Sequence, residues 1–231
     1  MSRKNVHNSG LVLIVVCLAG CLTAQSEGRP AKITSSAVWQ VSPQFMTAAH
    51  AACNMSSSSG EGECMIVQMA KAGAPADAVS FTRELYKQSH GEFGVMTGFQ
   101  DEGPVAFAWI TYPLRANTNY GFLLINGRPR IVNVEDLKLL DRKTMEQSTQ
   151  FRDLKNQFPK VDVWPGDRDG NTWPNSQTGP NGGIQFVVGY PLRNGCHACE
   201  HAGFAIFTWN FDAQGKFLGT TFAGMTPPPL Q

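Results

Sequence analysis

The chain has 231 residues, of which 42% are hydrophobic and 16% are charged. This composition is typical of a globular protein with one large domain or two small ones, and it excludes a disordered chain. The formal net charge is +1, and no block of like charge occurs, which argues against nucleic acid as a partner.

The N-terminus has the pattern of a secretion signal. Arg3 and Lys4 precede an uninterrupted apolar run at residues 11–19. The run is shorter than the roughly 20 apolar residues that a membrane-spanning helix requires, and it suits the core of a signal peptide. The sequence therefore predicts that residues 1–20 are removed on export.

The apolar run ends in Leu18-Ala19-Gly20-Cys21, which resembles the lipobox of bacterial lipoproteins. The resemblance implies cleavage before Cys21 and acylation of this cysteine, so that its acyl chains anchor the protein in a lipid bilayer. Leu22, rather than an aspartate, follows the cysteine. In such proteins this implies a lipid-anchored location in the cell envelope, at the outer membrane facing the periplasm.

Residues 21–36 are rich in Ser, Gly, Thr and Lys, so we expect a lipidated tether without fixed structure. Four cysteines follow it: Cys53, Cys64, Cys196 and Cys199. An exported protein meets an oxidising compartment, which favours disulfides. Three pairings can be drawn. The local one, Cys53 with Cys64 and Cys196 with Cys199, is the simplest because both loops are short.

The next part of the chain changes from a helical to a strand-like period. Apolar spacing predicts helices at residues 43–53, 65–72 and 77–89, the first of them capped by Ser42. Runs rich in β-branched and aromatic residues then predict strands at residues 93–99, 105–112, 120–125 and 130–134. Asn126-Gly127 predicts a tight hairpin between the last two strands.

The same order recurs in the second half. Residues 135–158 are charged and prone to helix, as one long helix or two broken ones. Strand-like runs follow at residues 161–164, 184–190, 203–211 and 216–223. Residues 226–231 contain three consecutive prolines and are expected to form an extended tail.

The tetrapeptide Tyr-Pro-Leu-Arg occurs at residues 112–115 and again at residues 190–193. Each copy ends a strand-like run, and a Gly-Phe pair opens the next run. The recurrence predicts an α+β fold of two tandem repeats, each a helix plus a four-stranded antiparallel sheet, at residues 37–134 and 135–225. This arrangement is similar to that of the β-lactamase inhibitory proteins, which bind another protein on a sheet face.

The segment Gly-Cys-His-Ala-Cys-Glu-His at residues 195–201 has three interpretations. It can be a disulfide-closed turn, a redox-active Cys-x-x-Cys, or a zinc or copper site with Cys196, His197, Cys199 and His201 as ligands. A strand-like run follows it, so no helix N-terminus lowers a thiol pKa. We therefore favour a structural disulfide and no cofactor, with zinc or copper as the alternative.

Residues 164–183 form an insertion relative to the first repeat, and they carry Trp164 and Trp173. Tryptophans on a polar loop suit a recognition surface; the alternative is that they pack back on the sheet. Arg115 and Arg193, which end the two tetrapeptides, either present two cations to a ligand or pair with acids at the sheet rim.

No nucleophile elbow, phosphate-binding loop or zinc-protease motif occurs in the sequence. We therefore expect a membrane-anchored periplasmic lipoprotein that acts as a non-enzymatic binding or envelope-associated module, with an envelope protein as partner. The alternative is a periplasmic thiol-redox or metal-handling protein that uses the Cys196-x-x-Cys199 segment.

Overall fold

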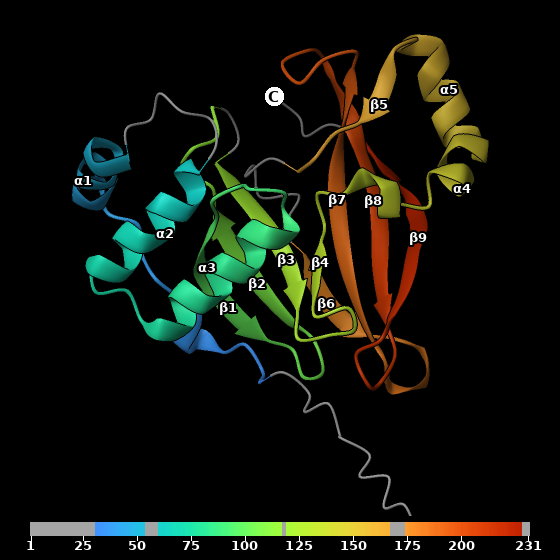
Figure 1. The fold of residues 1–231 in the computed structure, drawn as a ribbon. Helices are drawn as coiled ribbons and strands as arrows, with labels where there is room; N and C mark the ends of the chain where they lie inside the picture. Colours follow the sequence, from blue (N-terminus) through green and yellow to red (C-terminus); the bar gives the residue numbers. More distant parts are fainter. Residues whose placement is uncertain (1–30, 54–59, 117–118, 167–173, 228–231) are drawn as a thin grey trace, which may run out of the picture. The chain divides into compact units, whose positions relative to one another are not determined.

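The computed structural model describes residues 31–53, 60–116, 119–166 and 174–227. All elements described below belong to the unit Lys32–Gln231 (Figure 1). The predicted signal peptide, Cys21 and residues 228–231 lie outside the described residues. None of the helices in the described ranges is long and apolar enough to span a bilayer.

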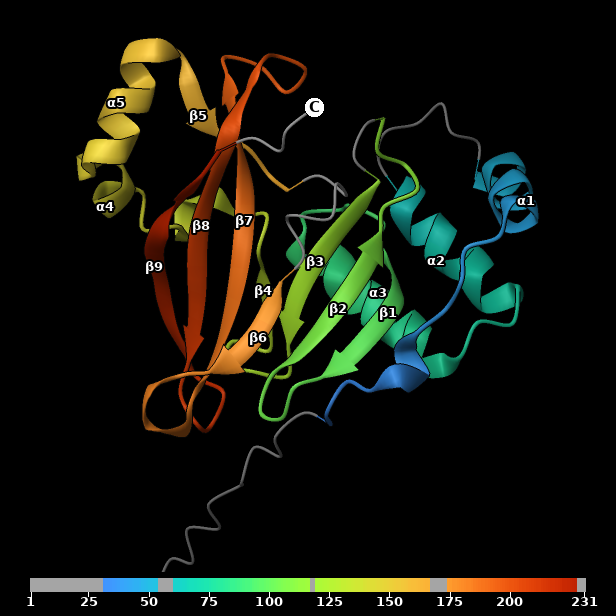
Figure 2. The same ribbon diagram turned by 180° about the vertical axis from the view of Figure 1, so that it is seen from behind.

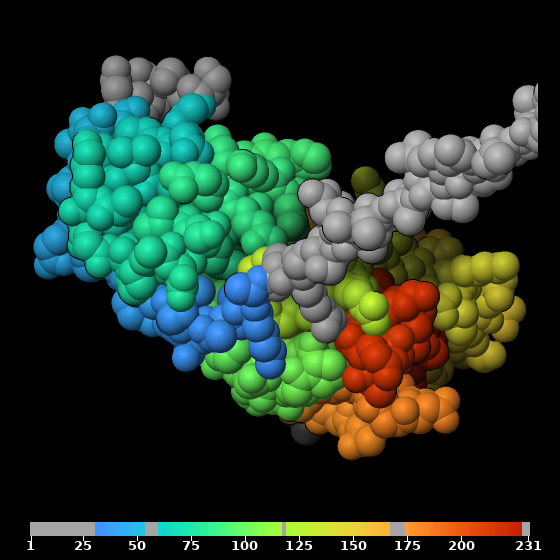
Figure 3. Space-filling view, turned by 60° about the horizontal axis from the view of Figure 1, so that its bottom comes forward, coloured from blue at the N-terminus to red at the C-terminus, as the bar shows by residue number. Residues whose placement is uncertain are grey.

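The C-terminal part of the predicted tether has fixed structure. Ile33 is 6% exposed. Its N–H donates to Asn126 Oδ1 at 2.7 Å, and the Asn126 side-chain amide donates back to Ile33 O at 2.8 Å. The short 3-10 helix η1 (Ser35–Ala37) follows. In Figure 3 this blue segment lies against the green residues of the first sheet. The prediction of an unstructured tether up to residue 36 was therefore wrong at its C-terminal end.

Three helices follow: α1 (Pro43–Cys53), α2 (Glu61–Lys71) and α3 (Ala76–Gln88). Ser42 Oγ accepts the N–H of Phe45 at 3.1 Å, which confirms the predicted cap of α1. Helix α2 begins at Glu61 rather than at residue 65, and its N-cap Gly60 has a φ of 100°, a left-handed conformation that glycine adopts readily. Its first turn carries two acids, which suit the positive end of the helix dipole.

The first sheet is antiparallel in the order β1 (Val95–Asp101), β2 (Ala106–Thr111), β3 (Tyr120–Ile125) and β4 (Ile131–Asn133). All four predicted strands are therefore confirmed. The β3–β4 turn is wider than predicted. Asn126 has the expected positive φ, 70°, but its N–H donates to Arg130 O at 2.9 Å. The loop thus closes across residues 126–130 rather than across two residues.

The predicted helical region of the second half consists of η2 (Leu137–Leu139), α4 (Arg142–Gln147) and α5 (Thr149–Gln157). Ser148 separates the last two, and its Oγ accepts the N–H of Phe151 at 3.1 Å. The second sheet contains β5 (Val161–Val163), β6 (Asn175–Thr178), β7 (Ile184–Asn194), β8 (His201–Phe211) and β9 (Phe217–Thr226).

The second sheet is antiparallel in the order β5-β7-β8-β9, and β6 pairs with β7. Strand β6 comes from the predicted insertion, so this sheet has five strands instead of four. The short 3-10 helix η3 (Pro180–Gly182) joins β6 to β7. The α+β fold with two antiparallel sheets is confirmed.

The two sheets share a core, because the first sheet is buried on both faces. Along β2, Ala108 and Ile110 pack with residues of α3 and η1, whereas Phe107, on the opposite face, packs with the second sheet. Helix α3 lies in front of the first sheet in Figure 1 and behind it in Figure 2. Alternating side chains of one strand thus serve two cores.

Backbone hydrogen bonds also join the sheets at one end. Arg128 N–H donates to Gly215 O at 2.7 Å, and Phe217 N–H donates to Arg128 O at 2.9 Å. Figure 3 shows this contact between the yellow-green β3–β4 loop and the red residues near β9.

The two halves have the same connectivity, a helical region followed by an antiparallel meander, but they differ in register. In the first half Gly121 pairs with Ile110, which precedes Tyr112 in the chain. In the second half Gly203 pairs with Leu192, which follows Tyr190 in the chain. The second tetrapeptide therefore remains inside a strand, whereas the first one leaves the sheet.

Candidate functional site

The first tetrapeptide forms a turn directly after β2. Arg115 N–H donates to Tyr112 O at 3.2 Å, and the Arg115 Cζ lies 3.6 Å from the centroid of the Tyr112 ring. Tyr112 is 1% exposed, and burial raises the pKa of its phenol above the ordinary value. A neutral, fixed ring therefore supports the guanidinium through a cation–π contact.

Two carboxylates hold the same guanidinium. Arg115 donates to Glu92 through Nε and Nη2 and to Glu135 through Nη1 and Nη2. The Nη2 distances are 3.0 Å to Glu92 and 2.9 Å to Glu135. Burial opposes the charge on Arg115, but the bonds to both glutamates outweigh burial and raise its pKa. Burial raises the pKa of Glu135 in spite of the arginine. The cluster thus combines one guanidinium with two carboxyl side chains.

A cavity of about 620 Å³ opens beside this cluster. Its walls combine charged, amide and aromatic side chains, among them Arg115, Asn133, Glu135, Asp136, Trp164 and His197. The volume lies within the range of about 300–1,000 Å³ that is usual for ligand sites. We call this space the larger cavity.

Trp164 forms an aromatic wall of the larger cavity. Its backbone N–H donates to Pro191 O at 2.9 Å, which fixes the residue next to β7. Its ring lies 5.9 Å from that of His197, centroid to centroid, with an interplanar angle of 75°. The Trp164 Nε1 atom is buried and has no hydrogen-bond acceptor among the described residues. The indole is therefore positioned by backbone and ring contacts.

Two of the four residues predicted for a binding surface thus meet in one cavity, Arg115 and Trp164. Arg193 lies elsewhere, because its Nη1 donates to Cys199 O at 3.4 Å inside the β7–β8 hairpin. The two arginines of the repeat therefore have different surroundings, since only the first tetrapeptide forms a turn. Trp173 lies outside the described residues, and its predicted role stays a prediction.

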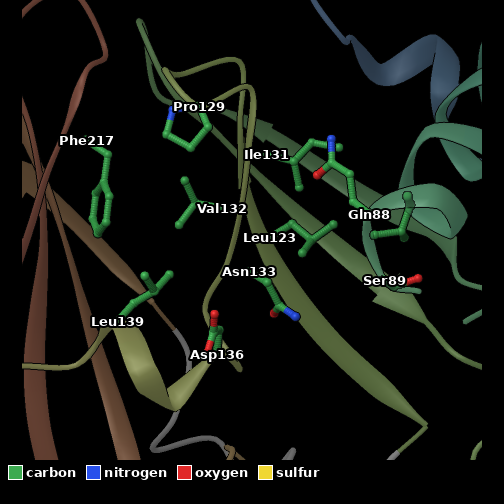
Figure 4. A pocket seen from close by; sticks show the side chains of 11 residues that line it. Gln88, Ser89, Leu123, Pro129, Ile131, Val132, Asn133, Asp136, Leu139 and Phe217 are labelled. Atoms are coloured by element: carbon green, nitrogen blue, oxygen red, sulfur yellow. The ribbon is translucent and has the colours of Figure 1, made fainter. Parts of the chain in front are cut away.

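A smaller cavity, of about 230 Å³, is also lined by Asn133 and Asp136. Figure 4 shows its mostly apolar walls, made by Leu123, Ile131 and Val132 of the first sheet, Leu139 of η2 and Phe217 of β9. The polar ends of Gln88 and Ser89 lie at its margin. Asn133 and Asp136 form the wall that the two cavities have in common.

No family model, curated protein or solved structure matches this chain. Its similarity in arrangement to the β-lactamase inhibitory proteins stays an expectation from the order of its elements, and its function is argued from the residues of the site.

The cysteines pair locally, as predicted. The sulfur atoms of Cys53 and Cys64 lie 2.05 Å apart, and those of Cys196 and Cys199 lie 2.11 Å apart. The second bond closes the tip of the β7–β8 hairpin, where Cys199 N–H donates to Cys196 O at 3.0 Å. It therefore closes a turn rather than the start of a helix.

The four residues of the zinc or copper alternative have other contacts in the structure. Cys196 and Cys199 are bonded to each other, His197 lies beside Trp164, and the His201 ring lies 4.6 Å from that of Phe204. Within the described ranges, no group of three or more His, Cys, Asp or Glu side chains is arranged to hold a metal ion.

Sequence reasoning missed Glu92, Glu135 and Asp136. Glu92 precedes β1, and Glu135 and Asp136 are adjacent between β4 and η2, so no spacing pattern connects them with Arg115. Glu92 and Glu135 are 23 and 20 residues away from Arg115 in the chain, and only the fold brings them together.

Proposed function

We propose that this chain is a lipid-anchored protein of the bacterial envelope that binds a ligand or an envelope protein without catalysing a reaction. The lipobox-like tetrapeptide supports the anchor at Cys21. The observation that carries the binding role is the larger cavity, in which Arg115, Trp164 and His197 meet.

The chemistry of the larger cavity supports binding. Its arginine is held by two glutamates and a tyrosine ring, so the guanidinium is a fixed part of the wall. Trp164 supplies an aromatic surface, and such residues carry much of the affinity at binding sites. A rigid wall with one aromatic anchor is suited to recognition because little conformational freedom is lost on binding.

The binding role is tested by cross-linking the full chain to its partners in intact envelopes. Trp164→Ala should weaken capture of the cross-linked partner about thirtyfold, the effect of removing an aromatic anchor worth roughly 2 kcal/mol. Leu218→Ala is the matched control, because Leu218 is 61% exposed and lines neither cavity. Capture by the Trp164 variant at the wild-type level, with an unchanged circular dichroism spectrum, refutes the proposed site.

The anchor is tested separately. Cys21→Ser should abolish incorporation of labelled palmitate and move the protein from the membrane fraction to the soluble fraction. Labelled protein that persists after this substitution contradicts the proposed acylation site.

The second candidate is thiol–disulfide chemistry at Cys196 and Cys199. One observation favours it: Cys196 is exposed at the tip of a hairpin, where another thiol can reach it. Titration of the mature chain with glutathione measures its reduction potential. A structural disulfide should lie below about −300 mV, whereas catalytic ones have higher potentials. A value near that of known oxidoreductases would favour this second candidate.

A further inference from the structure

We infer that the two cavities form one site for an amphipathic organic cation, a charged amine or guanidinium with an apolar group beside it. This inference rests on the proposed binding function and names the ligand class of the same site. It starts from Asn133 and Asp136, which line both cavities. A ligand bound at their common wall contacts both spaces.

The smaller cavity is suited to a single apolar group. Its volume of about 230 Å³ is below the range of about 300–1,000 Å³ that holds a whole small ligand. Leu123 and Ile131 line it from the first sheet and Phe217 lines it from β9 (Figure 4). Leu139, another residue of its wall, is 38% exposed. Burial of an apolar group here is favourable because its walls are already apolar.

The charges at the common wall favour a cation. Arg115 is matched by two glutamates, and Asp136 adds a further negative charge. Asp136 Oδ1 accepts the N–H of Lys138 at 3.1 Å as the cap of η2. The Asp136 carboxylate forms no salt bridge among the described residues. An anion bound at this wall is repelled by Asp136 and lies next to Glu135, whereas a cation is attracted by the Asp136 carboxylate.

The larger cavity adds an aromatic wall. Trp164 lines it together with Asp136, and the face of an indole attracts amines and guanidinium groups. A cation at Asp136 therefore has a carboxylate and an aromatic ring on the walls around it, while its apolar group enters the smaller cavity. The cation can belong to a free amine, or to a lysine or arginine that follows an apolar residue in a peptide.

Calorimetry on the purified full chain in detergent distinguishes these sources. The small-molecule probes are phenethylamine, phenylacetate and methylamine. The peptide probes are N-acetylated, C-amidated Leu-Lys-Leu and Leu-Glu-Leu. We expect phenethylamine to bind about fivefold more tightly than phenylacetate, the upper end for a partly exposed ion pair. Methylamine should bind more weakly, because it has no apolar group. If the lysine peptide binds more tightly than phenethylamine, the source is a peptide; the reverse order indicates a free amine.

The decisive variant is Asp136→Asn, because asparagine still accepts the capping hydrogen bond but removes the charge. It should weaken binding of phenethylamine about fivefold and leave phenylacetate binding unchanged or stronger. Asp153→Asn is the control, since Asp153 is an exposed acid on α5 that lines neither cavity. This control should bind phenethylamine as the wild type does.

Equal affinity for phenethylamine and phenylacetate overturns the inference, and so does an Asp136→Asn variant with wild-type affinity for phenethylamine. Absence of saturable binding by every cationic probe up to about 10 mM also overturns it. If Trp164→Ala abolishes partner capture while no cation is preferred, only the ligand class is wrong and the proposed function stands. If Trp164→Ala leaves capture intact, the proposed function fails independently of the calorimetry.

Discussion

The hydroxyl of Tyr190, the tyrosine of the second tetrapeptide, forms two buried hydrogen bonds, one to Val134 just after β4 and one within the second sheet. It donates to Val134 O at 2.8 Å and accepts the Nε1–H of Trp209 at 3.0 Å. Tyr190 is 1% exposed and Trp209 is 0% exposed. Burial raises the pKa of Tyr190 well above its ordinary value, so the hydroxyl keeps its proton.

Tyr190→Phe keeps the ring and removes only this hydroxyl. The substitution leaves the Trp209 Nε1–H without its acceptor and the Val134 carbonyl without this donor. A buried hydrogen-bonding group that loses its partner costs about 1–3 kcal/mol. With two such groups, the free energy of unfolding should fall by about 2–6 kcal/mol. For a domain of this size, a loss of about 3 kcal/mol lowers Tm by roughly 6–12 °C.

The assay is urea denaturation followed by circular dichroism and tryptophan fluorescence. The midpoint should fall at an unchanged slope, since the surface exposed on unfolding stays the same. Tyr112→Phe is the matched control from the other tetrapeptide. It retains the ring beneath Arg115, and its hydroxyl forms no hydrogen bond among the described residues. Its cost should stay below about 1 kcal/mol. A Tyr190→Phe loss no larger than that of the control refutes the reasoning.

Three further predictions concern stability. Replacing Cys196 and Cys199 by serine should lower the free energy of unfolding by about 2 kcal/mol, the chain-entropy value for so short a loop, and an unchanged urea midpoint contradicts this. Thr82→Val should leave the free energy of unfolding unchanged or raise it by about 1 kcal/mol. The reason is that Thr82 is 0% exposed and its Oγ1 has no hydrogen-bond partner among the described residues. A decrease in the free energy of unfolding of more than about 1 kcal/mol, measured by calorimetry, refutes this prediction. Burial raises the pKa of Glu135, so the folded state binds its proton more tightly than the unfolded state. The contribution of Glu135 to stability is therefore fully present below the ordinary glutamate pKa and is lost as pH rises through the raised pKa. Glu135→Gln should remove this part of the pH dependence in urea denaturation series that extend upward from the ordinary glutamate pKa. An identical dependence in the variant argues against a raised pKa.

The sequence by itself determined the local elements and the disulfide pairing. Helix α1 was predicted together with its cap at Ser42, and all strands except β6 were predicted, because side-chain periodicity and turn chemistry act over a few residues. The pairing of Cys53 with Cys64 and of Cys196 with Cys199 followed from the short loops between them. The repeated tetrapeptide indicated two halves with one order of elements.

Only the tertiary structure decided how these elements combine. Polar residues 175–178 became β6 because β7 offers a free edge, which no pattern within those residues shows. The two copies of Tyr-Pro-Leu-Arg have the same sequence, yet Arg115 borders a cavity and Arg193 lies within a hairpin. That difference arises from the register of β7 with β8. The cluster around Arg115 and the common wall at Asp136 depend on residues far apart in the chain, and contacts of this kind are set by the packing of the two sheets rather than by local spacing.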